Sequence, residues 1–371
     1  MLRDATGRYD TSLAGGESVR AFVPDPLPPL PPLDLGGARQ AALGRLDSIA
    51  LLLPDPQLFL YACVRREAVL SSQIEGTQSS LSDLLLFELD ELPGVPFDEV
   101  VEVSNYVAAL EHGMARLREG FPLCNRLLRE MHVQLMARGC GADKASGEFH
   151  SRGGFETRPY AGTRSGNARF VPPPLLDSFI HSETTQLPLL LKAALAHVQF
   201  ETIHPFLDGN GRLGRLLIAL LLHEGGALAQ PLLYLSLYFK QHRALYYELL
   251  DRVRISGDWE AWVEFFLDGV EQTATAAVQT ARRLVDLFQQ VQAGGRGAAN
   301  VHRVLESLRR RPLCSLRQID LHAGISFPTA SKAMLALVEM GIARELTGQR
   351  RNRVFVYDAY LNILNEGGAA L

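Results

Sequence analysis

Residues 204–215 read HPFLDGNGRLGR and run directly into the apolar stretch LLIALLL at 216–222. The apolar stretch predicts a buried helix that begins near Gly211, and the glycines before it predict a tight turn at the helix N-terminus. Backbone N–H groups converge at such a turn and attract anions, so the turn is a candidate phosphate site. Arg212 and Arg215 lie three residues apart and share a helix face, from which both guanidinium groups can grip phosphate oxygens.

Two further side chains of this segment, Asp208 and His204, are candidates for binding a metal ion and for accepting a proton. Asp208 supplies a hard carboxylate oxygen of the kind that binds Mg²⁺, the ion that normally accompanies a nucleoside triphosphate. His204 can take up a proton at neutral pH. A lone histidine or a lone G-x-G is more often structural, but this combination predicts a phosphoryl- or nucleotidyl-transfer site. The chain has neither a G-x-x-x-x-G-K-[ST] phosphate loop nor a G-x-G-x-x-G turn after a strand, which excludes two other nucleotide-binding motifs.

The segment matches, position for position, the H-x-F-x-[DE]-G-N-G-R-x-x-R signature of the Fic (filamentation induced by cAMP) family. Most characterised Fic proteins transfer AMP from ATP to a hydroxyl group of a target protein. The resemblance implies that His204 is the catalytic base and that Asp208 holds Mg²⁺ between the α- and β-phosphates of ATP. It also implies the nucleotide-binding residues, which are Gly209, Asn210 and Gly211 as the phosphate cradle, with Arg212 and Arg215 on the β- and γ-phosphates.

Two other positions gain a meaning from the resemblance. Phe206 is implied to be a hydrophobic anchor that fixes the loop beneath the site. Relatives that phosphorylate their targets carry Lys where Gly211 stands, and they bind the nucleotide in the reverse direction. Gly211 therefore favours AMP transfer over phosphorylation.

A second group of polar residues lies upstream. Glu67, Ser71 and Glu75 follow one another at four-residue spacing, so they share one helix face, and Gly76 provides a natural stop. On their own they are typical of a solvated helix edge with a glycine cap. Beside the Fic signature, however, Ser71-x-x-x-Glu75-Gly76 resembles the [ST]-x-x-x-E-[GN] inhibitory motif of the family. That resemblance implies that Glu75 pairs with Arg215 in the place of the ATP γ-phosphate and inhibits the enzyme.

Composition sets the broad class of the protein. With 371 residues, of which 47% are hydrophobic, the chain is long enough for two or three domains, and its net charge of −4 gives no global attraction to nucleic acid. The four cysteines show no C-x-x-C pair and no zinc-ligand spacing, which favours a reducing compartment. The start lacks the apolar stretch of a signal peptide, and the longest apolar run, 216–222, is too short to span a bilayer. No membrane contact is expected, and the predicted location is cytoplasmic.

The periodicity predicts a mainly α protein, and the resemblance implies a Fic-type helical core with a small β-hairpin flap. Helices are predicted at 38–53, 57–76, 79–88, 98–119, 123–138, 175–182, 188–202, 211–224, 240–254 and 258–292. Strand-like alternation is scarce before residue 340, and the proline-rich stretch 24–32 predicts an extended arm. Three regions are expected: an N-terminal Fic-associated region at 1–97 with the inhibitory helix at about 57–76, a catalytic core with trailing helices at 98–293, and a C-terminal domain at 294–371.

Residues 147–171 break the helical pattern and fit either a β-hairpin or a long loop, which in a compact domain is usually functional. In the Fic family a hairpin flap at this place docks an extended segment of the target protein by strand addition. The target protein is therefore expected to dock at this flap. Residues 152–158 match the flap poorly, so the resemblance says least about target choice.

The C-terminal region follows a linker at 294–299 and has the outline of a winged helix-turn-helix. Helices are predicted at 301–311, from Ser315 and at 328–341, followed by an alternating wing. From 296 to 371 the chain carries 11 Lys and Arg against 6 Asp and Glu, which is compatible with DNA binding through 300–357. Protein contacts, including a homodimer, are an equal alternative because the third helix offers few side chains for reading bases.

Three functions compete on this sequence. The leading one is a self-inhibited protein adenylyltransferase that uses ATP and Mg²⁺ and modifies a target protein as well as itself. A hydrolase that removes AMP through the same residues is the second. The third is a nucleotide-sensing DNA-binding regulator, but an inactive core should have lost His204 or an arginine, and none is lost.

Overall fold

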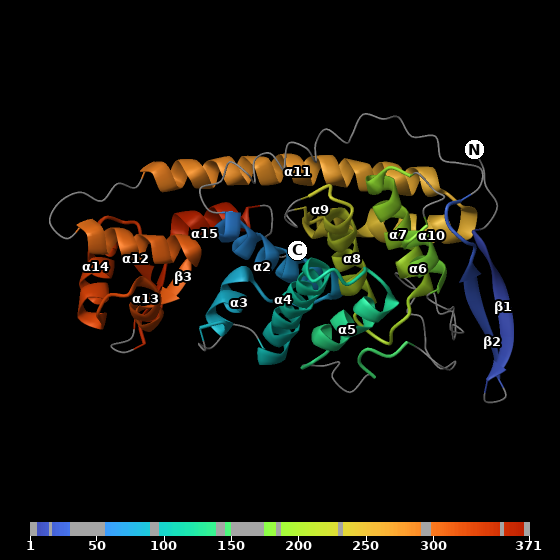
Figure 1. The fold of residues 1–371 in the computed structure, drawn as a ribbon, viewed down its shortest axis with the longest axis horizontal. Coiled ribbons are helices and arrows are strands. Elements are labelled where there is room, and N and C mark those ends of the chain that lie inside the picture. Colours follow the sequence, from blue (N-terminus) through green and yellow to red (C-terminus); the bar gives the residue numbers. More distant parts are fainter. Residues whose placement is uncertain are drawn as a thin grey trace.

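The computed structural model describes residues 6–14, 17–29, 56–89, 96–138, 145–149, 174–182, 187–228, 233–290, 298–348 and 352–366. The helix predicted at 38–53, most of the predicted flap (150–171) and most of the predicted linker (294–297) lie outside the described residues. Within the described residues the protein is mainly helical and elongated, as predicted, with small antiparallel sheets near its two ends (Figure 1).

The central element is α8 (Asn210–Glu224), the helix that follows the glycine-rich turn. Nearly every side chain from Leu213 to Leu222 is buried, because other helices cover α8 on several sides. Those helices include α2 (Pro56–Glu75), α4 (Phe97–Arg118), α5 (Asn125–Leu135) and α7 (Leu189–Ile203). A helix enclosed in this way is apolar all round rather than along one stripe. The prediction of a buried helix beginning near Gly211 is confirmed.

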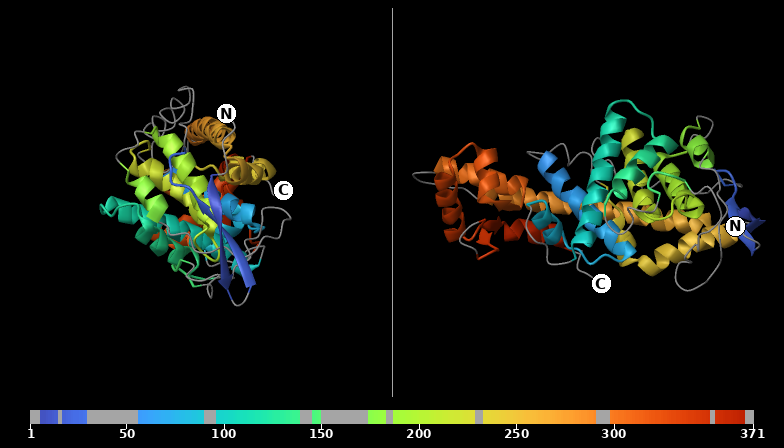
Figure 2. Two further views of the ribbon diagram at one scale, coloured as in Figure 1. Left: turned by 90° about the vertical axis from the view of Figure 1, so that its right-hand side faces the viewer. Right: turned by 90° about the horizontal axis from the view of Figure 1, so that it is seen from below.

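The surrounding helices complete the core. They are α3 (Leu81–Phe87), α6 (Pro174–Ile180), α9 (Ser236–Gln241), α10 (Arg243–Ser256) and α11 (Trp259–Gln290). A capping box fixes the start of α3, since Ser80 and Asp83 exchange hydrogen bonds. The single helix predicted at 240–254 is wrong: the chain forms α9 and α10, with a break at His242. Helix α11 runs along one long side of the molecule (Figures 1 and 2).

The N-terminal end carries a β-hairpin that the sequence analysis missed. Strands β1 (Gly7–Ala14) and β2 (Glu17–Pro24) pair antiparallel, with Tyr9 opposite Phe22. The expectation of scarce strand structure before residue 340 is therefore wrong for this segment. Two runs of strand-forming residues separated by the dipeptide Gly15-Gly16 predict a β-hairpin. In this segment the hairpin is indicated by the Gly-Gly turn and not by an alternation of apolar and polar residues.

The other end is formed by residues 298–366, which we call the C-terminal module. Its helices are α12 (Ala298–Arg310), α13 (Leu316–Ala323), α14 (Phe327–Glu339) and α15 (Asp358–Asn365). Its strands are β3 (Leu313–Ser315), β4 (Arg344–Glu345) and β5 (Val354–Val356), in the antiparallel order β3-β5-β4. Strand β3 and helix α15 were not predicted. The helix-turn-helix interpretation of α13 and α14 stays a prediction, with which the order of elements agrees.

The C-terminal module packs against the long helix α11 and against the first turns of α2. Tyr360 is fully buried and meets Phe288 of α11 edge to face, with ring centroids 5.2 Å apart. Glu366 pairs with Arg283 of α11, and its backbone carbonyl accepts a hydrogen bond from Arg66 of α2. Helix α2 thus contacts the C-terminal module near its start and α8 further along. No helix in the described part of the chain combines the length and hydropathy needed to cross a membrane.

Candidate active site

The loop between α7 and α8 is held in a defined shape by its own side chains. His204 caps α7 with a left-handed backbone (φ 49°), a conformation that costs a non-glycine residue free energy and is concentrated at functional sites. Gly209 is also left-handed (φ 74°) and begins α8. The amide of Asn210 spans the loop: it accepts from the Phe206 N–H at 2.9 Å and donates to the Phe206 carbonyl at 2.7 Å. The Asn210 side chain therefore holds the loop closed. These two hydrogen bonds do not use the backbone N–H of Asn210, which is left for the expected phosphate cradle.

The side chains of this site differ in how far they are exposed to solvent. The side chains of His204 and Asp208 are 43% and 38% exposed, so a base and a carboxylate face solvent. The side chains of Arg212 and Arg215 are only 6% and 2% exposed. Phe206 is fully buried, as the anchor prediction requires. The resulting arrangement is an accessible imidazole and an accessible carboxylate close to two buried guanidinium groups at a helix N-terminus.

Arg212 is oriented by two carboxylates. Its Nη1 lies 3.3 Å from Glu102 Oε2 on α4, and its Nη2 lies 3.8 Å from Asp208 Oδ1. Glu102 was not identified from the sequence, because a polar residue on the inner face of a helix has no motif around it. Its charge offsets the desolvation of the buried guanidinium and fixes the direction of Arg212.

Arg215 is held by the end of α2. Its Nε donates to the Ser71 hydroxyl at 2.8 Å, and its Nη2 donates to the Ser71 carbonyl at 2.9 Å and to Glu75 Oε1 at 2.7 Å. Burial lowers the pKa of Arg215, but the charge of Glu75 raises it, and the net pKa lies above the ordinary value. The structure thus brings Ser71, Glu75 and Arg215 together, although Glu75 and Arg215 are 140 positions apart in the sequence.

Gly211 lies directly beneath the inhibitory carboxylate. A Cβ atom at position 211 would collide with Glu75 Oε1 and would lie 3.2 Å from Arg215 Nη1. Gly76, just after Glu75, has a φ of 114°, so it too needs glycine's freedom. A side chain at position 211 would therefore displace the Glu75 carboxylate from its present position beside Arg215.

The upstream face of α2 is buried rather than solvated. Glu67 is 3% exposed and accepts hydrogen bonds from the hydroxyls of Ser236 and Tyr106, on α9 and α4. Burial raises the pKa of Glu67 to about 7, although Ser236 and the charge of Arg215 act to lower it. Lys240 of α9 donates to Gln73 at 2.8 Å. These bonds fix α2 on the core independently of Glu75.

His132 is a second residue that the sequence analysis missed. It is fully buried on α5, and its ring stacks on that of Phe206 with centroids 3.8 Å apart. Both ring nitrogens make hydrogen bonds, to the Asp208 carbonyl at 3.0 Å and from the Gly147 N–H at 2.8 Å. A histidine in an amphipathic helix gives no signal from sequence spacing, so only the fold reveals this contact with the loop.

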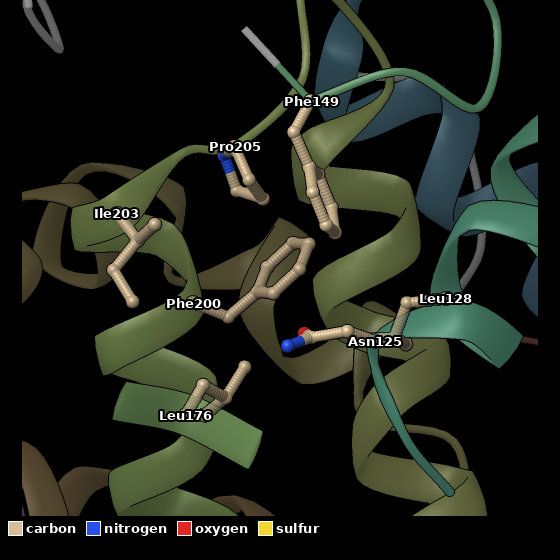
Figure 3. Close-up of a pocket in the computed structure, with 7 residues that line it drawn as sticks. All are labelled: Asn125, Leu128, Phe149, Leu176, Phe200, Ile203 and Pro205. Carbon is tan, nitrogen blue, oxygen red and sulfur yellow. The ribbon is translucent and has the colours of Figure 1, made fainter. Parts of the chain in front are cut away.

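A small apolar pocket lies behind the loop (Figure 3). It is lined by Asn125, Leu128, Phe149, Leu176, Phe200, Ile203 and Pro205. Figure 3 shows Phe149 beside Pro205 and opposite Phe200, so residues 145–149 cover this side of the loop. The lining carries no charged group, and the pocket therefore offers packing rather than chemistry.

The possible metal-binding side chains near the loop agree with an ion that is bound by the protein and the substrate together. Among the described residues there is no cluster of three or more His, Cys, Asp and Glu side chains that could hold a metal ion alone. Asp208 is accessible, and its Oδ1 accepts from the Gly209 N–H at 2.7 Å. Mg²⁺ typically binds one or two carboxylates together with phosphate oxygens and water. One exposed carboxylate beside a phosphate cradle fits that ion.

Comparisons with known proteins agree with this geometry. The Fic/DOC family N-terminal model matches residues 34–115 and the Fic/DOC family model matches residues 122–222. The protein adenylyltransferase Fic of Drosophila grimshawi is 30% identical over 212 residues, which cover 54% of this chain and 40% of that protein. The protein of the same name from Culex quinquefasciatus is 39% identical over 106 residues, covering 28% of this chain and 20% of its own length. The chain thus spans less than half the length of either curated relative.

The fold has a solved counterpart. A Fic family protein from Desulfovibrio desulfuricans G20 superposes with a TM-score of 0.55 at 21% identity, over 88% of this chain and 98% of its own. The shared helical core, the family-model matches and the position-for-position signature at 204–215 agree. The chain belongs to the Fic/DOC family.

Proposed function

We propose that this protein is a self-inhibited protein adenylyltransferase, which moves AMP from ATP to a hydroxyl group of a target protein. The observation that carries the proposal is the arrangement at 204–215: an accessible His204 and Asp208 stand above the buried Arg212 and Arg215 at the start of α8. Relatives that are named protein adenylyltransferase add support, as does the Fic/DOC family model, whose match at 122–222 includes this segment.

In the proposed reaction, the target hydroxyl oxygen attacks the α-phosphorus of ATP. A bond forms between that oxygen and the α-phosphorus, and the bond to the oxygen bridging the α- and β-phosphates breaks, so pyrophosphate leaves. His204 accepts the hydroxyl proton as general base. Arg212 and Arg215 offset the negative charge of the departing phosphates, and the N–H groups at the start of α8 bind phosphate oxygens. Asp208 would hold Mg²⁺, which supplies positive charge between the phosphates when bound.

The same proposal assigns inhibition to Glu75. Its carboxylate lies 2.7 Å from the Arg215 guanidinium and close to Gly211. In the proposal this carboxylate takes the place of the ATP γ-phosphate. While this pair persists, one phosphate ligand is unavailable, and the carboxylate repels the nucleotide's charge. Because Glu75 itself is 38% exposed, water competes for it, and the nucleotide can displace it.

Two radioactive labels test the proposed reaction. The Glu75→Gly variant is incubated with ATP labelled on either the α- or the γ-phosphate, in the presence of Mg²⁺, and the protein is separated and counted. Label is expected from α-labelled ATP alone, accompanied by a mass gain equal to AMP. Incorporation from γ-labelled ATP would mean that the chain is a kinase, and incorporation of neither label into any protein would contradict transferase activity.

The proposal also assigns partners to two regions of the chain. The flap at 147–171 is proposed to dock the target, but its larger part lies outside the described residues. DNA binding through 300–357 is proposed on the excess of Lys and Arg there, although Arg344 pairs with Asp358 and Arg353 pairs with Glu345. Homodimer formation through the C-terminal module likewise remains a proposal.

A further inference from the structure

We propose that His132 is a positioning residue of the active site: as a neutral imidazole it fixes the Asp208–Gly209 peptide and, through it, the carboxylate that would bind Mg²⁺. This inference rests on the proposed function, because it assigns a role towards the metal ion of that reaction. It concerns a residue outside the 204–215 signature and outside the inhibitory helix.

The two hydrogen bonds of His132 define its protonation state. The Gly147 N–H points at Nδ1 from 2.8 Å, so Nδ1 must carry a lone pair. The Asp208 carbonyl oxygen lies 3.0 Å from Nε2, so Nε2 must carry the proton. Only the neutral tautomer protonated at Nε2 satisfies both partners.

The ring is fixed by packing as well as by these bonds. It lies nearly parallel to the Phe206 ring, with an interplanar angle of 7°. A Cβ atom at position 209 would lie 3.7 Å from His132 Nε2, so the loop passes directly over the imidazole. Arg129, one turn earlier on α5, donates to the Gly147 carbonyl at 2.6 Å and holds the segment on the far side of the ring. The imidazole is therefore braced between α5, Phe206 and residues 145–149.

The hydrogen bond from His132 to the Asp208 carbonyl acts on the Asp208 side chain through one planar peptide unit. The Asp208 carbonyl and the Gly209 N–H are the two ends of that planar unit. At one end the carbonyl accepts from His132, and at the other the N–H donates to Asp208 Oδ1 at 2.7 Å. Gly209 allows many backbone conformations, so the loop sequence alone does not fix this plane. His132 thus selects the orientation in which the Gly209 N–H holds the carboxylate.

Two substitutions separate the two bonds. A glutamine amide nitrogen reaches about as far as Nε2 and can still donate to the Asp208 carbonyl, whereas an asparagine oxygen reaches about as far as Nδ1 and can accept only from Gly147. His132→Phe keeps the stacked ring and loses both bonds. Each change is made in the Glu75→Gly/His204→Ala background, which leaves the nucleotide site open and removes the base.

The measurement is calorimetric titration of ATP at a series of Mg²⁺ concentrations, with a parallel thermal melt. His132→Phe and His132→Asn are expected to raise the Mg²⁺ concentration for half-maximal binding by about two- to tenfold, the effect of one hydrogen bond. Binding of metal-free ATP should stay unchanged, and His132→Gln should restore most of the Mg²⁺ dependence. If the phenylalanine variant does not fold, the asparagine and glutamine variants decide the question.

Several outcomes would overturn the inference. An unchanged Mg²⁺ requirement in the phenylalanine and asparagine variants would show that the peptide is fixed without His132. An equal loss of metal-free ATP binding would indicate a collapsed loop and a merely structural residue. A glutamine variant as impaired as asparagine would exclude the Asp208 bond as the cause. If the Glu75→Gly protein binds Mg²⁺ and ATP but transfers no AMP, the proposed function fails while the binding data still decide the role of His132.

Discussion

Arg215 is a buried charge to which the proposed function gives two partners in turn, Glu75 and a phosphate group of ATP. Its guanidinium is almost inaccessible, yet three hydrogen bonds from it end on Ser71 and Glu75. Two of these bonds involve Ser71, which is itself fully buried and does not depend on the carboxylate. The arginine therefore stays oriented when Glu75 leaves, because Ser71 continues to satisfy Nε and part of Nη2. An oriented guanidinium costs little further ordering when a phosphate arrives.

The first residue-scale prediction concerns the base. In the Glu75→Gly background, His204→Ala should lower the rate of AMP transfer by about 10²–10⁴-fold, the typical effect of removing a general base. ATP affinity should be retained, since the phosphate ligands belong to α8. Initial rates with α-labelled ATP and a separate binding titration measure the two quantities. Undiminished transfer by the alanine variant would contradict the assignment of His204.

A second prediction follows from the raised pKa of Glu67. Between the ordinary pKa of 4.5 and about 7, the folded protein holds a proton on Glu67 that the unfolded chain has released. The stability that this proton contributes is complete below about pH 4.5 and is lost as the pH rises through about 7. Glu67→Gln should remove this loss, so its stability should fall less than that of the wild type between pH 5 and pH 8. Urea unfolding at both pH values tests this, and parallel losses in the two proteins would refute it.

The sequence identifies the parts of the site that are local in the chain. His204, Asp208 and the arginines were assigned correctly to one loop-and-helix unit because their chemistry falls within a single segment. Glu102, His132 and Ser236 could not be found in this way, since each is a lone polar residue that reaches the site or its surroundings from another helix. An inward-facing polar residue and a solvated one have the same helical spacing, and only packing separates them.

At the scale of elements, the residues that anchor α2 are separate from Glu75, the residue that we propose to be inhibitory. Glu67 and Gln73 attach it to α9, and its apolar residues pack into the core. Glu75 is the last residue of the helix and is exposed. Replacement of Glu75 should therefore leave the helix docked. By contrast, replacement of Glu67 would leave the hydroxyls of Ser236 and Tyr106 without their buried acceptor, which makes it unsuitable as a neutral control.

We expect Glu75→Gly to raise the rate of AMP transfer by at least about tenfold, which is the lower end of the effect of losing one charge-assisted hydrogen bond. Its control is Glu119→Gly, which removes a glutamate at the C-terminal end of α4, where the side chain is 64% exposed. Transfer rates and melting temperatures of both variants are compared with the wild type. Equal activation by both changes would point to charge alone, and a loss of transfer in Glu75→Gly would show that Glu75 supports the site instead of inhibiting it.

Helix prediction succeeded where elements are long and failed where they are short. The 3.6-residue period gave the core helices to within a few residues, because their apolar faces recur over several turns. The break at His242 was missed, since the apolar period continues across it. Strand β3 has three residues and helix α15 has eight, too few for a periodic signal, and contacts with neighbouring elements determine both.

At the scale of the whole molecule, apolar packing holds the C-terminal module against α11 and α2. Tyr357 and Tyr360 are buried beside Phe288, whereas the Arg283 and Glu366 side chains are 49% and 56% exposed. Exposed ion pairs contribute at most about 1 kcal/mol, much less than a buried aromatic ring. The attachment of the module should therefore depend on the rings and be insensitive to salt.

Substitutions at this contact test that ranking. Tyr360→Ala should lower the free energy of unfolding by about 3–5 kcal/mol, whereas Glu366→Ala should change it little. Tyr360→Phe should be neutral or stabilising, because the Tyr360 hydroxyl is buried with no hydrogen-bond partner among the described residues. Denaturant unfolding at low and high salt measures all three. A larger effect for Glu366→Ala than for Tyr360→Ala would reverse the ranking.

The end of α2 has a consequence for how resting activity can be adjusted. Beyond Glu75 the chain turns at Gly76, where the Gly76 and Thr77 N–H groups donate to the carbonyls of Gln73 and Ser72, and the Gln73 side chain donates to the Ser79 carbonyl. The Gln78 side chain donates to the Gly76 carbonyl, and the Gln78 N–H donates to Glu99 of α4. Helix ends open locally at far lower free energy than the core. In the proposed self-inhibited enzyme, the fraction of time that Arg215 is released from Glu75 then depends on the local opening of this turn. Substitutions at positions 76–79 should therefore change the resting rate of AMP transfer, although every residue proposed to bind the nucleotide stays unchanged.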